Sequence, residues 1–152
     1  MLPALITDVV AIMQSAFDKR RLNIEVHISD NLPPILSDRN KLVQVLINLL
    51  KNAVESIDDQ LAIDPEMVPR ISVDISLTDD EYYDFSISDN GMGIKEEIKD
   101  HVFEFGTTTK RTGSGFGLHD CANFIRASQG RIGISSNSNG IGAVVSFTLP
   151  VK

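Results

Sequence analysis

The feature that most constrains the fold of this chain is a long amphipathic segment between residues 38 and 58. Its apolar side chains recur at the three- and four-residue spacing of a helix, at Leu42, Val45, Leu46, Leu49, Ala53 and Ile57. The Pro33-Pro34 pair breaks regular structure before it, and Ser37 or Asp38 can cap the helix that follows. Because so broad an apolar stripe has to be buried, we predict that one face of this helix packs on the rest of the domain.

On either side of this helix, the spacing of apolar residues is that of a helix in some segments and that of a strand in others. Helical spacing before it, at Leu5, Val9, Ile12, Met13 and Phe17, predicts a first helix. Alternation of apolar and polar residues predicts strands at 22–28, 70–77, 83–88, 131–135 and 143–149, with a turn at 78–81. Residues 117–129 fit a further helix closed by Gly130, and the acidic, proline-containing segment 59–69 is predicted to be an exposed loop.

This order of elements predicts an α/β fold. We expect a two-layer α/β sandwich, with a mixed, mostly antiparallel sheet of about five strands and about three helices on one face. A chain of 152 residues with 42% apolar content is expected to form a single domain, residues 1–152.

Composition narrows the possible partners. The chain has 21 acidic and 14 basic residues, which argues against nucleic acid as the main partner. No apolar run approaches the ~20 residues of a membrane span, so we expect no direct membrane contact by this domain, although it can belong to a longer membrane-anchored protein. The single Cys121 cannot form an intrachain disulfide, and no Cys/His cluster has metal-ligand spacing, which predicts a reducing, cytoplasmic location.

Two asparagines interrupt the amphipathic helix. Asn48 and Asn52 are four residues apart and therefore share one helix face. A buried amide without partners costs about 1–3 kcal/mol, so a pair of them in an apolar segment needs a reason. Either they face a ligand or they are capped or solvent-facing amides, and the helix alone leaves both interpretations open.

The stretch from Asp89 to Leu118 contains six of the ten glycines of the chain. It begins where a predicted strand ends, which places the Asp89 carboxylate at a sheet edge that can face a cleft. Glycine lets backbone approach a ligand closely and lets a loop hinge, so we predict a nucleotide site with a mobile lid at approximately 90–115. The stretch matches neither the G-x-x-x-x-G-K-[ST] phosphate loop nor a Rossmann unit.

Four short segments give this interpretation its specificity. They are N-L-L-K-N-A at 48–53, D-N-G-M-G-I at 89–94, F-E-F-G-T-T-T-K at 103–110 and G-S-G-F-G-L at 113–118. In this order they closely resemble the N, G1, F and G2 boxes of the GHKL ATP-binding superfamily, in particular the catalytic and ATP-binding domain of sensor histidine kinases. The resemblance covers nearly the whole chain and implies an ATP-dependent protein histidine kinase of two-component signal transduction.

The resemblance implies a role for each matching residue. Asp89 would accept a hydrogen bond from the adenine amino group, with Gly93 giving room at the base. Asn52 would bind Mg²⁺, and the two residues implied to be catalytic are Asn48, near the phosphates, and Lys110, a cation near the γ-phosphate. The other residues implied to bind ATP are Gly91, Ile94, Phe103, Thr108, Thr109, Gly113, Ser114, Gly115, Phe116, Gly117 and Leu118. Among them, the glycines at 113–117 would bring backbone N–H groups to the phosphates at a helix N-terminus.

The same resemblance implies partners that lie outside this chain. The phosphoacceptor of histidine kinases is a histidine on a separate helical dimerisation domain, and none of His27, His101 and His119 lies in such a context. We therefore expect this chain to bind Mg-ATP and ADP without phosphorylating itself. Its expected protein partners are that helical domain and, downstream, the receiver domain of a response regulator, in a full-length homodimer.

Alternative functions within the superfamily remain to be weighed. A hydrolase of the gyrase or heat-shock chaperone type would carry a glutamate at position 48 to orient water, and Asn48 cannot act as that base. A protein serine kinase of the anti-sigma-factor type shares the fold and much of the motif set. The remaining alternative is a nucleotide-gated interaction module whose lid alters partner docking.

Overall fold

A computed structural model of the chain describes residues 2–35, 37–79, 81–93, 116–136 and 141–151. The described elements follow the chain in the order α1 (Leu2–Lys19), β1 (Asn23–Ile28), α2 (Arg39–Ile63), β2 (Arg70–Thr78), β3 (Tyr82–Asp89), α4 (Phe116–Ala127), β4 (Ile132–Ser136) and β5 (Ala143–Pro150).

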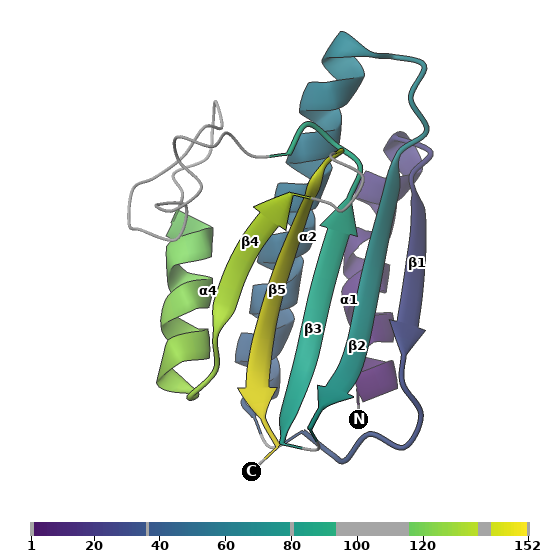
Figure 1. Ribbon diagram of the computed structural model, residues 1–152. Helices are drawn as coiled ribbons and strands as arrows, with labels where there is room; N and C mark the ends of the chain where they lie inside the picture. Colours follow the sequence, from purple (N-terminus) through teal and green to yellow (C-terminus); the bar gives the residue numbers. More distant parts are fainter. Residues whose placement is uncertain (1, 36, 80, 94–115, 137–140, 152) are drawn as a thin grey trace.

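The five described strands form one mixed sheet in the order β1-β2-β3-β5-β4. β1 pairs with β2 in parallel, because α2 connects them as a crossover, whereas the other neighbouring strands are antiparallel. The three helices α1, α2 and α4 all cover the same face of the sheet (Figure 1). The predicted α/β sandwich is therefore confirmed, including its mostly antiparallel sheet.

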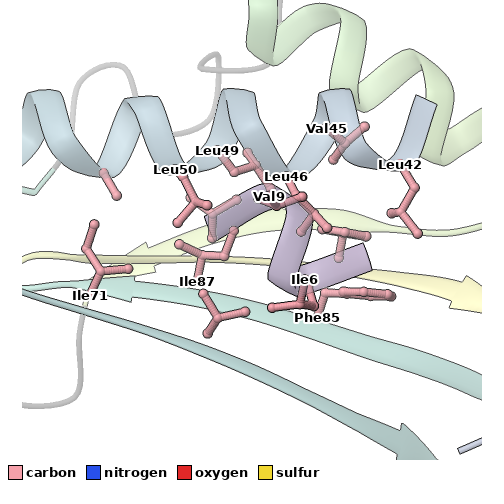
Figure 2. Packing of buried hydrophobic residues seen from close by; sticks show 14 of the residues in the cluster. Ile6, Val9, Leu42, Val45, Leu46, Leu49, Leu50, Ile71, Phe85 and Ile87 are labelled. Carbon is pink, nitrogen blue, oxygen red and sulfur yellow. The ribbon is translucent and has the colours of Figure 1, made fainter. Parts of the chain in front are cut away.

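The strands β2, β3 and β5 alternate between a covered and an uncovered face, as the sequence pattern predicts. In β3, for example, Tyr83, Phe85 and Ile87 are buried while the residues between them are partly exposed. Figure 2 shows Leu46, Leu49 and Leu50 on the side of α2 that faces the sheet. These side chains belong to one buried cluster that extends from α1 across the sheet to β5, and this cluster fixes the position of α2.

Both ends of α2 have identifiable caps. Asp38 is the N-cap, because its side chain accepts a hydrogen bond from the Lys41 N–H at 3.2 Å. The helix ends at Ile63, five residues beyond the predicted end at Asp58, so the predicted loop at 59–69 was too long. The predicted boundary was wrong because acidic residues and prolines are typical of exposed loops, whereas Asp58 and Asp59 are helical here. Leu61 continues the apolar stripe and packs against the core, and the helix therefore continues.

The first helix also differs in one residue from its prediction. Ile12 was placed in the apolar stripe of α1, but its side chain is 60% exposed, whereas Ile6 is buried.

An ion pair joins the residue after α1 to α2. The Arg20 guanidinium donates to both carboxylate oxygens of Asp58, at 2.6 and 2.8 Å. None of the described helices is long and apolar enough to cross a membrane.

Candidate functional site

The Asp89 carboxylate is the buried polar centre of the candidate site. Asp89 is only 6% exposed and lies at the end of β3, where the sequence predicted it. Its Oδ1 accepts hydrogen bonds from the Gly91 N–H at 2.8 Å and from the Ser56 hydroxyl at 3.1 Å, and the backbone N–H of Ala143 is a third donor. Burial raises the pKa of this carboxyl, while the three hydrogen bonds oppose the rise.

The turn after Asp89 is packed directly against α2. A Cβ atom on Gly91 would lie 2.4 Å from the Ser56 carbonyl carbon, so only glycine fits at this contact. Gly93 has a φ of +83°, in the left-handed region that glycine adopts without strain. The Gly93 N–H donates to the Ser56 Oγ at 3.0 Å, and the Met92 N–H donates to the Ser56 carbonyl at 2.9 Å. The predicted ligand glycines therefore also have a structural role in seating this turn.

A second turn, immediately before β5, supports Asp89 from the other side. Gly142 has a φ of +79°, and a Cβ atom there would lie 2.0 Å from the Asp89 carbonyl oxygen. The following residue, Ala143, supplies the third donor to the Asp89 carboxylate. Neither Gly142 nor Ala143 was predicted from the sequence to belong to the site. The Gly-x-Gly pattern at 140–142 is the sequence signal that could have indicated this turn.

The side chain of Asn90, which lies between Asp89 and Gly91, forms hydrogen bonds with the protein backbone. Its Oδ1 accepts from the Arg70 N–H at 2.8 Å, and its Nδ2 donates to the Val68 carbonyl at 2.8 Å. These bonds tie the turn to the segment that precedes β2. Residues 89–93 of this motif are thus held by α2 on one side and by the start of β2 on the other.

The two asparagines of α2 share one face of the helix, as predicted, and both are partly buried. Asn48 donates through Nδ2 to the Cys121 Sγ of α4 at 3.8 Å, and Cys121 is itself buried. In the described part of the chain, no hydrogen bond joins the Asn52 side chain to another group. Asn48 is therefore oriented by α4, whereas the amide of Asn52 is available to a ligand.

A cleft of about 390 Å³ opens between α2 and α4 beside Asn48. It is lined by Lys41, Gln44, Val45, Asn48, Asp120, Cys121, Asn123 and Phe124. The cleft adjoins the helix face that carries the asparagines, at the end opposite Asp89. Among the described residues there is no cluster of three His, Cys, Asp or Glu side chains that could hold a metal ion.

Several predicted site residues lie outside the described residues: Ile94, Phe103, Thr108, Thr109, Lys110, Gly113, Ser114 and Gly115. Their assigned roles stay predictions, as does the lid at 90–115, which is mostly outside the described ranges. α4 begins at Phe116 and continues through Gly117, one residue before the predicted start. Leu118, which was predicted to bind ATP, is 8% exposed and belongs to the buried cluster, so its side chain packs in the core.

The chain is similar to known proteins in sequence and in fold. A family model described as histidine kinase-, DNA gyrase B-, and HSP90-like ATPase matches residues 37–152. Sensory histidine kinase/phosphatase NtrB of Rhizobium meliloti is 35% identical over 129 residues, which are 80% of this chain and 34% of that protein. This chain therefore spans about a third of the length of that curated relative.

Solved histidine kinases share the fold. The catalytic domain of histidine kinase ThkA matches with a TM-score of 0.81 and 26% identity, over 99% of this chain and 94% of that one. Full-length ShkA in complex with AMPPNP matches with a TM-score of 0.83 and 26% identity, over 99% of this chain and 30% of that one. ThkA in complex with response regulator protein TrrA matches with a TM-score of 0.78 and 24% identity, over 99% and 40% of the two chains.

The resemblance drawn from the four sequence boxes is thereby confirmed at the level of the family. The match to the family model covers well over half of the chain, and both the curated relative and the solved neighbours are histidine kinases. This chain belongs to the family of histidine kinase-, DNA gyrase B- and HSP90-like ATPases.

Proposed function

We propose that this chain is the Mg-ATP-binding catalytic domain of a two-component sensor histidine kinase, which delivers the γ-phosphate of ATP to a histidine on a separate helical dimerisation domain. One observation carries the proposal. The buried Asp89 carboxylate and the two asparagines are attached to the same helix, Asp89 through Ser56 and the asparagines directly. The helix α2 thus sets the distance between the carboxylate proposed to bind the base and the two amides proposed to lie near the phosphates.

Asp89 has the chemistry to select adenine. An ionised carboxylate only accepts hydrogen bonds, so it pairs with the exocyclic amino group of adenine. Guanine presents a carbonyl oxygen at the same position, which would face the carboxylate without a proton between them. A carboxylate can accept about four hydrogen bonds, more than the three donors that hold Asp89 in place.

The amide of Asn52 fits Mg²⁺ bound together with ATP. Mg²⁺ prefers oxygen ligands and keeps several waters, so one amide oxygen and the phosphate oxygens suffice without a carboxylate cluster. When bound, the ion would neutralise charge on the phosphates during transfer. Asn48, oriented by Cys121, would lie beside the phosphates, and its amide cannot act as the base that a hydrolase needs to activate water. Lys110 is proposed to add positive charge near the γ-phosphate.

The phosphoacceptor and the protein partners are proposed to lie elsewhere in the full-length protein. His27 is exposed on β1 beside Glu25, at 3.3 Å, and His119 lies beside Asn123 at 3.1 Å, so neither is part of the Asp89 site. The product phosphohistidine would donate to a receiver domain, in keeping with the ThkA–TrrA complex. We place the domain in the cytoplasm, where ATP is supplied, within a homodimer, with neither nucleic acid nor the membrane as its partner.

A labelling experiment tests the transfer step. The chain is incubated with γ-labelled ATP and Mg²⁺, alone and together with the full-length protein in which Asn52 is replaced by alanine. We expect label only on the full-length protein, because it supplies the acceptor histidine and this chain supplies the ATP site. Acid-labile label on the isolated chain would contradict the assignment of the phosphoacceptor to another domain.

Calorimetry tests the metal assignment separately. Asn52→Ala should abolish the Mg²⁺-dependent part of ATP affinity, measured with Mg²⁺ and with EDTA. Asn40→Ala is a matched control, because Asn40 is exposed on the first turn of the same helix. Unchanged Mg-ATP affinity in Asn52→Ala would show that this amide does not bind the ion.

A further inference from the structure

The polar face of α2 extends one turn further than the two asparagines. Asn48, Asn52 and Ser56 occupy every fourth position of the helix, and all three are partly buried. Side chains four residues apart lie above one another on a helix, so the three form a row from the α4 contact at one end to the Asp89 turn at the other. Ser56 is the member of this row that contacts Asp89.

Ser56 contacts the Asp89 turn through its hydroxyl, its carbonyl and its backbone. Its hydroxyl donates to Asp89 Oδ1 at 3.1 Å and accepts from the Gly93 N–H at 3.0 Å. Its carbonyl accepts from the Met92 N–H at 2.9 Å, and its backbone packs against Gly91. One residue of a long, well-packed helix thus sets the position of both the carboxylate and the backbone that follows it.

The direction of these bonds is fixed by the number of protons. A serine hydroxyl has one proton, and a backbone N–H can only donate. Because the Gly93 N–H needs the hydroxyl as an acceptor, the hydroxyl proton is left for Asp89, whose Oδ1 must accept it. Oδ1 therefore carries no proton of its own, and these bonds hold the carboxylate in a single orientation.

We propose that Ser56 is a positioning residue for adenine selection, whose hydroxyl fixes the Asp89 carboxylate in the orientation in which it accepts the adenine amino group. This inference rests on the proposed function, since it assumes that Asp89 reads adenine. Without the hydroxyl, the carboxylate would lose a donor that fixes its orientation, and the Gly93 N–H would lose its acceptor.

The test compares two ligands that differ only in the group that Asp89 is proposed to read. The chain is titrated by calorimetry with Mg-ATP and with the Mg complex of purine riboside triphosphate, which lacks the amino group. Ser56→Ala should weaken ATP binding roughly tenfold, the size expected for disturbing a hydrogen bond to a charged group, and should leave the analogue nearly unchanged. Ser56→Cys, which keeps the side-chain volume but donates weakly, should show the same pattern.

Ser72→Ala is the matched control. The Ser72 hydroxyl also donates to a carboxylate, that of Asp74 at 3.0 Å, but on the sheet face that the helices do not cover. It should change the affinity for neither ligand. An equal loss for both ligands in the Ser56 variants would show a merely structural role and overturn the inference.

Failure of the proposed function would look different from failure of the inference. If the unmodified chain binds both nucleotides equally, and Asp89→Asn changes neither affinity, then Asp89 does not read adenine and the inference falls with that assignment. If Asp89→Asn removes the preference for ATP while Ser56→Ala keeps it, the adenine assignment stands and only the role of Ser56 is wrong.

Discussion

Replacing Gly142 by alanine should destabilise the domain through the turn that supports Asp89. The added Cβ would lie 2.0 Å from the Asp89 carbonyl oxygen and 2.7 Å from its carbonyl carbon, far inside van der Waals contact. Both contacts are with backbone, which cannot rotate away as a flexible side chain can. The residue also has a φ of +79°, which costs a residue with a Cβ about 1–2 kcal/mol.

The two effects add to a measurable loss. A backbone shift that relieves an overlap of this kind costs roughly 1–3 kcal/mol, so the free energy of unfolding should fall by about 2–5 kcal/mol in total. With a urea m-value of about 2 kcal/mol per molar, the unfolding midpoint should fall by about 1–2.5 M. Urea titration followed by circular dichroism measures both the midpoint and the m-value.

Gly133→Ala is the internal control for this substitution. Gly133 lies in β4, and nothing lies within 4 Å of a Cβ atom added there. Its replacement should be neutral or stabilise by up to about 1 kcal/mol, because alanine loses less conformational freedom on folding. Equal midpoints for the two variants would refute the close approach of the Gly142 turn to Asp89.

Two further predictions concern Asp89 and the cap of α2. Because burial raises the pKa of Asp89, the folded state holds the proton at a pH where the unfolded state releases it. Relative to Asp89→Asn, the unmodified domain should therefore gain stability as the pH falls from neutral through the raised pKa, as measured by urea titration at several pH values; a constant difference would contradict the burial argument. Asp38→Ala should lose about 1 kcal/mol through the missing N-cap bond to the Lys41 N–H, whereas Ser37→Ala should lose nothing in the same assay. A loss of stability in Ser37→Ala, with none in Asp38→Ala, would contradict the assignment of Asp38 as the N-cap.

Much of the fold could be predicted because its periodic patterns are long and unambiguous. The apolar stripe of α2 and the alternation in β3 each persist over enough residues to set both the type and the facing of the element. The end of α2 was predicted too early. Asp58 and Asp59 only weakly disfavour a helix, and the packing of Leu61 against the core outweighs that preference. Tertiary contacts of this kind leave no local signal in the sequence.

The candidate site was predictable only where its residues occur in recognisable motifs. Asp89 and the asparagines belong to such motifs, and the structure places them on β3 and on one face of α2. Ser56 and Gly142 do not, because their importance comes from long-range contacts with the Asp89 turn, 33 residues away in the case of Ser56. Such contacts depend on the finished packing of α2 and β5 on the sheet, which no single segment encodes.

The central claim is that Asp89, held by α2 and the turn before β5, makes this domain an adenine nucleotide site. Titration of the chain with Mg-ATP and Mg-GTP by calorimetry tests it most directly. The account predicts saturable ATP binding at a single site and GTP binding at least about tenfold weaker, because the guanine carbonyl would face the Asp89 carboxylate. Equal affinities for ATP and GTP, or a preference for ATP that persists in Asp89→Asn, would contradict it.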